Sequence, residues 1–321
     1  MNGIDSSAGL LAIVGPTASG KSEVALTVAA SAGAEILACD SVQVYRGFDI
    51  GCAKPTRAEQ EQVRHHLVDV VDWSDAFDAQ RYCTLALDAI ADAALRGKRV
   101  ILCGGTGLYL RALRYGLIDA PERDLTLRES LYAEEQTRPG VLYDRLQKLD
   151  PVSARSIEPK NLVHVVRALE IYTQTGELPS VLKARHGFTT ERLPMRVVAI
   201  DWPREVLRER IRARTEAMLA AGLVDEVRGL IERGVPTTCR PMRAVGYREV
   251  CEWLEGEAEG AACCATTEDL AQRIARATWE YARRQYTWLR KEKGVVWISA
   301  AEGIGAVSTH IVNHEGPLVI T

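Results

Sequence analysis

Residues 15–22, with the sequence GPTASGKS, combine the residue types that hold a phosphate group. The glycines of such a loop permit backbone conformations that turn several N–H groups toward one anion. The lysine adds a full positive charge, and the hydroxyl of the serine after it can ligate Mg²⁺. We therefore predict a phosphate-binding loop with Ser22 as the metal ligand. Its residues are Gly15, Pro16, Thr17, Ala18, Ser19, Gly20, Lys21 and Ser22.

The segments on either side of this loop predict the elements that position it. Leu10–Val14 is a short apolar run typical of a buried strand, and the pattern of Lys21–Ala32 predicts a helix. The loop then lies at a helix N-terminus, where the helix dipole favours an anion. Further apolar runs predict buried parallel strands at residues 35–38, 99–103, 196–200 and 295–298. Because helical stretches separate these runs, we expect an α/β fold, a P-loop NTPase-like parallel sheet flanked by helices.

One long stretch of the chain has no strand pattern. Between residues 117 and 193 the periodicity predicts successive helices, at residues 126–136, 141–149 and 161–175. A strand-poor block between the strands of a sheet is typical of an inserted domain. We therefore expect an all-helical insertion at residues 117–193, within a catalytic core formed by residues 1–116 and 194–321.

Composition narrows the class of protein. The 321 residues are 47% hydrophobic and 26% charged, with a net charge of −3, as in an ordinary globular protein. No apolar run approaches the ~20 residues of a membrane helix, and residues 1–9 have no signal-peptide pattern. The eight cysteines include no C-x-x-C pair, which favours free thiols in a reducing compartment. We therefore expect a cytoplasmic protein with no membrane partner.

The acidic residues near the loop leave its ligand open. ATPases and kinases commonly place a carboxylate at the end of a second strand to hold magnesium. Here the strand before Gly104 has none, whereas the strand ending at Cys39 runs directly into Asp40. Asp40 is suited to hold the metal through water, to act as a general base, or only to cap a helix. Basic runs at residues 204–214 and 273–293 are either solvated helix faces or phosphate-binding surfaces.

Four later segments give a more specific indication. Residues 40–55 (DSVQVYRGFDIGCAKP), 104–109 (GGTGLY), 167–170 (RALE) and 242–248 (MRAVGYR) follow the loop in order. Together with the loop, they resemble the signatures of the tRNA dimethylallyltransferases, over residues 11–289. The resemblance implies a P-loop core with a helical insertion, a requirement for Mg²⁺ and no use of ATP. Three departures fall at Cys52, where threonine is usual, in residues 72–82, and at His164, where a basic residue is usual.

The activity implied by the resemblance is a prenyl transfer to tRNA. The dimethylallyl group moves from dimethylallyl diphosphate to N6 of the adenosine on the 3′ side of the anticodon, position 37. The tRNAs read codons that start with U, and the products are N6-isopentenyladenosine and diphosphate. The resemblance makes Asp40 the general base, Thr106 its hydrogen-bond partner and Arg214 a further cation on the leaving diphosphate. We also expect a monomer.

The resemblance further implies contacts with the anticodon stem-loop, from which the target base must be extruded. The implied tRNA-binding residues are Asp40, Ser41, Val42, Gln43, Thr106, Arg128, Val163, His164, Val165, Val166, Arg167, Met242, Arg243, Ala244, Val245, Gly246 and Tyr247.

Three other functions are compatible with parts of the sequence. An isopentenyltransferase for free adenine nucleotides would share the loop and the base, but would need neither the insertion nor the 242–248 segment. An ATP-dependent small-molecule kinase would share the loop, although the strand before Gly104 lacks the usual carboxylate. An RNA-binding module with a degenerate loop conflicts with the intact Gly15, Gly20, Lys21 and Ser22.

Overall fold

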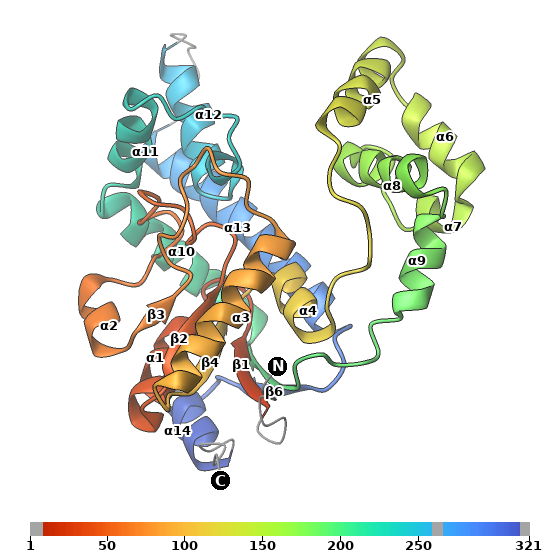
Figure 1. Cartoon of the computed structure of the whole chain (residues 1–321). Helices are drawn as coiled ribbons and strands as arrows, with labels where there is room; N and C mark the ends of the chain where they lie inside the picture. Colours follow the sequence, from red (N-terminus) through yellow and green to blue (C-terminus); the bar gives the residue numbers. More distant parts are fainter. Residues whose placement is uncertain (1–8, 259–265, 315–321) are drawn as a thin grey trace. The chain divides into compact units, whose positions relative to one another are not determined.

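A six-stranded parallel sheet forms the centre of the larger part of the chain. The computed structural model describes residues 9–258 and 266–314. The strands are β1 Leu10–Val14, β2 Glu35–Cys39, β3 His65–His66, β4 Val100–Gly104, β5 Met195–Asp201 and β6 Val295–Ser299. Their order is β3-β2-β4-β1-β5-β6 (Figure 1). The five strands predicted from apolar runs are confirmed. The central strands have apolar runs because their side chains are buried on both faces of the sheet. The two-residue β3 has no apolar run and was not predicted.

The register of the central strands brings three chain segments to one edge of the sheet. Val14 at the end of β1 and Cys39 at the end of β2 both pair with Gly104 at the end of β4. In a parallel sheet the carboxyl ends of the strands meet at the same edge, where ligands bind. The phosphate loop, Asp40 and the turn before Thr106 therefore begin side by side.

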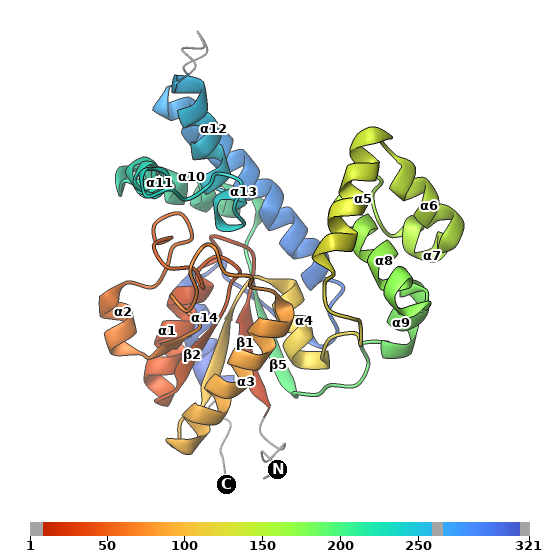
Figure 2. The same ribbon diagram turned by 45° about the horizontal axis from the view of Figure 1, so that its top comes forward.

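Helices separate the strands and cover the sheet. In this part of the chain they are α1 Lys21–Ala32, α2 Arg57–Gln62, α3 Ala79–Leu95, α4 Gly107–Tyr115, α10 Arg204–Ala220, α11 Leu223–Glu232, α12 Tyr247–Ala258, α13 Thr267–Leu289 and α14 Ile304–His314, with a 3₁₀ helix at Pro241–Arg243. Val24 and Val28 of α1 and Val307 and Ile311 of α14 share one core with the sheet. Helices α10 and α13 pack on one another beyond the carboxyl edge of the sheet, around Leu207, Ile211 and Ala282 (Figure 2).

The chain divides into two compact units, Met1–Arg114 with Leu193–Thr321, and Tyr115–Arg192. The second unit is helical throughout, with α5 Leu125–Thr137, α6 Val141–Leu149, α7 Pro151–Arg155, α8 Leu162–Thr175 and α9 Pro179–His186. Leu142, Leu146 and Val165 are among its fully buried core residues. The short helices α7 and α9 were not predicted, because each is too short to show a period. Within the described residues, no helix is both long and apolar enough to cross a membrane.

Candidate active site

The phosphate loop has the backbone conformation that its glycines predict. Gly15 and Gly20 have φ angles of 156° and 85°, and a Cβ atom on Gly15 would lie 2.7 Å from the Ser19 hydroxyl oxygen. Helix α1 begins at Lys21, and its N-cap residue Gly20 provides no side-chain hydrogen bond. The first N–H groups of α1 therefore lack a side-chain cap and can donate to an anion.

Three residues from the second segment of the first unit, residues 193–321, hold this loop in place. Trp202 Nε1 donates to the Ser19 carbonyl at 2.9 Å, and Arg210 Nε donates to the Ala18 carbonyl at 2.9 Å. The Gln285 amide accepts from the Thr17 N–H at 2.7 Å and donates to the Gly105 carbonyl at 3.0 Å. Sequence reasoning did not predict these roles, since each partner lies more than 180 residues away along the chain.

A cavity of about 670 Å³ opens beside the loop. It brings together eight predicted site residues, which are Thr17, Ala18, Gly20, Lys21, Ser22, Asp40, Gln43 and Arg214. Residues that were not predicted complete its lining, including Cys52, Lys54, Arg210, Met218, Tyr281 and Gln285. The cavity therefore joins the phosphate loop to the end of β2, the loop after it and helices α10 and α13.

Two cations in this cavity have no anionic partner among the described residues. Lys21 Nζ makes one hydrogen bond, to the Pro16 carbonyl at 3.4 Å, and Arg214 makes none. Burial is the main cause that lowers the pKa of Lys21, and burial likewise lowers the pKa of Arg214, while the charge of Asp40 acts in the opposite direction. A bound anion would stabilise the charged form of both groups. The cavity is therefore built for an anion.

Asp40 has both a structural role and access to the cavity. Its Oδ1 accepts from the backbone N–H groups of Val42 at 2.8 Å and Gln43 at 3.2 Å. These bonds form a turn that fixes the carboxylate while it lines the cavity. No helix begins at Asp40, so it caps a turn and not the helix that the sequence allowed. This turn is compatible with the role of a base, because the second carboxylate oxygen is not engaged in it.

Thr106 lies next to Asp40 but not on the cavity lining. Its N–H donates to the carbonyl of Cys39, the residue before Asp40, at 3.2 Å. Its hydroxyl is buried and has no hydrogen-bond partner in the part of the chain that the structure describes. A buried hydroxyl without a partner is unusual and is available to a neighbouring carboxylate or substrate.

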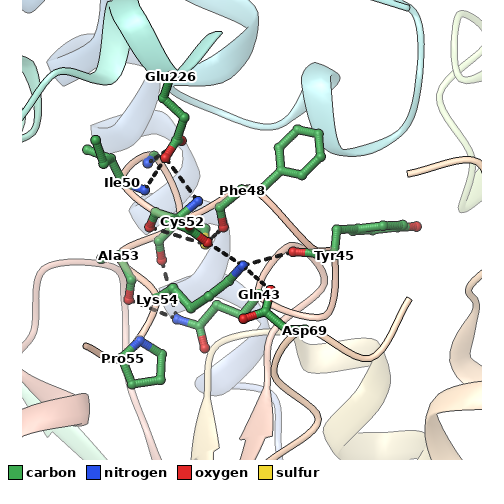
Figure 3. Close-up of polar contacts among 12 residues, drawn as sticks. Gln43, Tyr45, Phe48, Ile50, Cys52, Ala53, Lys54, Pro55, Asp69 and Glu226 are labelled. Atoms are coloured by element: carbon green, nitrogen blue, oxygen red, sulfur yellow. Dashed lines mark hydrogen bonds and ion pairs between the residues drawn. The ribbon is translucent and has the colours of Figure 1, made fainter. Parts of the chain in front are cut away.

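The loop after Asp40 is tied together by its own side chains (Figure 3). The Gln43 amide donates to the carbonyls of Cys52 and Ala53 at 3.3 and 3.1 Å. Lys54 Nζ contacts the Tyr45 carbonyl at 2.9 Å and Asp69 at 2.5 Å. The Cys52 thiol donates to the Phe48 carbonyl at 2.9 Å, as a threonine hydroxyl would. The Cys52 departure therefore leaves this local hydrogen bond in place.

Most side chains of residues 242–247 are buried or half-buried and pack inside the protein. Met242 and Tyr247 are fully buried, and the Tyr247 hydroxyl donates to Glu226 at 2.6 Å. Glu226 also accepts from the backbone N–H groups of residues 49–51 (Figure 3). Gly246 is buried, Ala244 and Val245 are half-buried, and Arg243 is exposed. Arg243 is thus the side chain of this segment that is open to a partner.

The predicted tRNA-binding residues of the second unit likewise include buried or paired side chains and exposed ones. Arg128 and Arg167 both pair with Glu170, a fully buried carboxylate, at 3.1 and 2.7 Å. Val165 and Val166 are buried in the core of this unit. Val163 and His164 are exposed at the start of α8. The arginines therefore have a structural role beside the predicted tRNA contact, because they neutralise a buried charge.

The remaining sequence features have simple structural counterparts. In the 72–82 departure, Asp78 caps α3 by accepting from the N–H groups of Gln80 and Arg81, and the Tyr82 ring stacks on Tyr109 at 4.3 Å. Ser41 and Val42 are half-buried in the Asp40 turn. The six cysteines in the described residues are free thiols. Cys263, Cys264 and residues 1–8 lie outside the described residues.

A parallel sheet with a phosphate loop and a cation-lined cavity at its carboxyl edge defines a P-loop-like α/β enzyme. The family model described as IPP transferase matches residues 43–292. The tRNA dimethylallyltransferase of Anaeromyxobacter sp. (strain Fw109-5) is 47% identical over 292 residues, which cover 90% of this chain and 94% of that relative. The tRNA dimethylallyltransferase 1 of Trichlorobacter lovleyi is 43% identical over 299 residues, 93% and 96% of the two chains.

Solved structures give the same result. The tRNA isopentenylpyrophosphate transferase from Bacillus halodurans matches with a TM-score of 0.68 and 33% identity, over 97% of this chain and 96% of that one. A eukaryotic dimethylallyltransferase, described as acting on tRNA, matches with a TM-score of 0.74 and 30% identity, over 95% and 76% of the two chains. The chain belongs to the IPP transferase family, and it is an enzyme of the prenyltransferase class.

Proposed function

We propose that this chain transfers a dimethylallyl group from dimethylallyl diphosphate to N6 of adenosine 37 in the anticodon stem-loop of tRNA. The tRNAs would read codons that start with U, and the products would be N6-isopentenyladenosine and diphosphate. One observation carries the proposal. Lys21 and Arg214 line the same cavity as Asp40, and neither cation has an anionic partner among the described residues. A diphosphate supplies the missing anion, and Asp40 supplies the base.

The leaving group accounts for the phosphate loop. As the bond between the allylic carbon and oxygen breaks, negative charge accumulates on the departing diphosphate. The groups that would bind this charge are in place before the reaction: Lys21, Arg214 and the first N–H groups of α1. They therefore stabilise the transition state, in which the charge develops, more strongly than they stabilise the bound substrate. The loop therefore assists departure of a whole diphosphate, without any need for ATP.

The nucleophile accounts for Asp40. The exocyclic amine of adenine is a weak nucleophile, and it must lose a proton when N6 bonds to the allylic carbon. The Asp40 carboxylate takes this proton, and its turn with Val42 and Gln43 fixes its direction. Thr106 follows β4 at the same edge of the sheet at which Asp40 follows β2. Its buried hydroxyl orients the carboxylate or the amine.

The donor groups of the cavity fit Mg²⁺. The Ser22 hydroxyl and the Asp40 carboxylate line the cavity, and the described residues contain no cluster of three His, Cys, Asp or Glu side chains that would hold a metal alone. Mg²⁺ typically takes one or two protein ligands and completes its shell with water and substrate phosphates. We propose that Ser22 holds the ion, which leaves Asp40 to act as the base. The bound ion would neutralise charge on the diphosphate.

For the tRNA, the exposed members of the predicted set are the side chains to test first. These are Arg243 in the first unit and Val163 and His164 in the second. The relatives named for tRNA and the structure described as acting on tRNA support this partner. We also propose that the enzyme is cytoplasmic, since its described cysteines are free thiols, and that it acts as a monomer, as expected above.

The test is a comparison of acceptors. The purified chain is incubated with labelled dimethylallyl diphosphate, Mg²⁺ and either tRNA or AMP, and the tRNA nucleosides are analysed by mass spectrometry. We expect label in tRNA as N6-isopentenyladenosine, and none in a matched transcript with guanosine at position 37, which has an oxygen in place of the N6 amine. Transfer to AMP alone would show a free-nucleotide enzyme instead. Turnover of ATP without prenyl transfer would show a kinase.

A further inference from the structure

Arg210 plays no part in the transfer described above, yet its surroundings are those of an anion-binding group. Its Nε donates to the Ala18 carbonyl at 2.9 Å, and its guanidinium carbon lies 4.5 Å from the centroid of the Trp202 ring. Within the described residues it forms no ion pair with Asp or Glu. Its terminal nitrogens therefore remain free to donate to another group.

The position of Gly20 shows where this free end lies. A Cβ atom on Gly20 would lie 2.4 Å from Ile304 Cδ1 and 3.3 Å from Arg210 Nη2, so the end of the guanidinium is beside the N-cap residue of α1. Arg210 also lines the cavity together with Lys21 and Arg214. Arg210 Nη2 thus lies beside the helix N-terminus at which the loop would hold phosphate oxygens, in a residue that lines the same cavity.

The guanidinium is held in this place before any ligand binds. Trp202, which lies against it, is itself tied to the loop through the bond from its Nε1 to the Ser19 carbonyl at 2.9 Å. Arg210 and Trp202 therefore fix adjacent loop carbonyls and each other. A cation that is already oriented loses little conformational freedom when it binds an anion.

Repulsion among the cations of this cavity also favours a bound anion. Arg210 and Arg214 are four residues apart on α10, and like charges at this spacing destabilise a helix. Lys21 adds a third cation to the same cavity. The carboxylates of Glu23, Asp40 and Glu59 also line the cavity, but none forms an ion pair with these three cations in the described structure. An anion with two or more charges would relieve the repulsion.

We propose that Arg210 is a second arginine ligand of the donor diphosphate, beside Lys21 and Arg214. A guanidinium matches phosphate with two parallel N–H bonds, and its charge would stabilise the leaving group as the allylic bond breaks. The inference rests on the proposed function, since it deepens the role of the same cavity. It also gives the Arg-x-x-x-Arg spacing on α10 a chemical reason.

The experiment measures binding of inorganic pyrophosphate with Mg²⁺ by calorimetry, for the full chain and three variants. Arg210→Gln should weaken binding about 10- to 100-fold, the range for a lost hydrogen bond to a charged group. Arg210→Lys keeps the charge without the planar guanidinium, so its affinity for pyrophosphate should fall between those of the parent and Arg210→Gln. The control is Arg212→Gln. Arg212 lies on the same helix, but it is exposed and pairs with Glu209, so this variant should bind pyrophosphate like the parent.

Two further measurements separate this role from a purely structural one. The melting temperature without ligand reports the fold, and tRNA affinity reports contacts with RNA phosphates. We expect Arg210→Gln to raise the KM for dimethylallyl diphosphate and lower kcat, with tRNA affinity unchanged.

Three results would overturn the proposal. One is normal pyrophosphate binding by Arg210→Gln. Another is equal loss in the Gln and Lys variants together with a lower melting temperature, which would make Arg210 only a support for the loop. The third is weaker tRNA binding with normal pyrophosphate binding. A chain that binds pyrophosphate through Arg210 but prenylates no tRNA would refute the proposed function and still support this inference.

Discussion

Replacing Tyr247 with phenylalanine tests whether this residue packs the protein or contacts RNA. Its side chain is fully buried, and its hydroxyl donates to Glu226 at 2.6 Å. The ring lies 5.2 Å from that of Phe48 in an edge-to-face arrangement. The substitution keeps the ring and its contacts, so no cavity forms, and it removes one hydrogen bond to a carboxylate.

The expected cost follows from that one bond. A hydrogen bond to a charged group contributes about 1.5–3 kcal/mol to stability. Glu226 keeps the N–H groups of Asp49, Ile50 and Gly51 as donors at 3.1, 2.8 and 3.4 Å, so it is not left unsatisfied. We therefore expect Tyr247→Phe to lower the free energy of unfolding by about 2 kcal/mol.

The assay is urea unfolding followed by circular dichroism, with tRNA affinity measured on the same samples. Tyr45→Phe is the matched control, because Tyr45 belongs to the same aromatic cluster and its hydroxyl has no hydrogen bond within the described residues. The control should lie within about 0.5 kcal/mol of the parent. If Tyr247→Phe were as stable as the parent but bound tRNA more weakly, the packing argument would be refuted and the predicted RNA contact supported.

Three more outcomes are expected. Asp40→Asn should lower single-turnover prenyl transfer by ~10²-fold or more with tRNA affinity nearly unchanged, because it removes the base and keeps the shape of the turn. The logarithm of the affinity for tRNA, measured by filter binding, should fall linearly with the logarithm of salt concentration, the result expected of basic side chains that bind phosphates. Burial alone would raise the pKa of Glu35, but hydrogen bonds from Arg96 and His66 lower it below the ordinary value of 4.5. A carboxylate with a lowered folded pKa contributes stability above its unfolded pKa and loses it as the pH falls through the folded pKa. The free energy of unfolding should therefore fall below about pH 4.5, and less steeply in Glu35→Gln.

Each of these has a result that contradicts it. Near-normal transfer by Asp40→Asn would remove Asp40 from the mechanism, whereas Asp40→Glu should retain part of the rate. A flat salt profile would argue against basic contacts with RNA. Identical acid unfolding curves for Glu35→Gln and the parent would show that the Arg96 and His66 contacts do not persist in solution.

The sequence by itself determined the features that depend on local pattern. The alternation of apolar runs and helices predicted five strands of the sheet, because a strand buried on both faces leaves a continuous apolar run. The loop around Lys21 was predictable because its glycines and lysine are contiguous. Asp40 was a candidate because it directly follows a strand, and the alternative that it caps a helix was wrong, since its bonds to Val42 and Gln43 close a turn and no helix begins there.

Only the tertiary structure decided which distant residues complete the site. Trp202, Arg210 and Gln285 contact a loop that lies more than 180 residues earlier in the chain. The basic run at residues 204–214 includes Arg210 but does not distinguish it from its neighbours, and no local pattern marks Trp202 or Gln285. The structure also showed that Met242, Tyr247, Val165 and Val166 are buried. A signature motif does not separate residues that hold a fold from residues that touch a substrate. Burial and partners, which arise from packing between remote segments, make that separation.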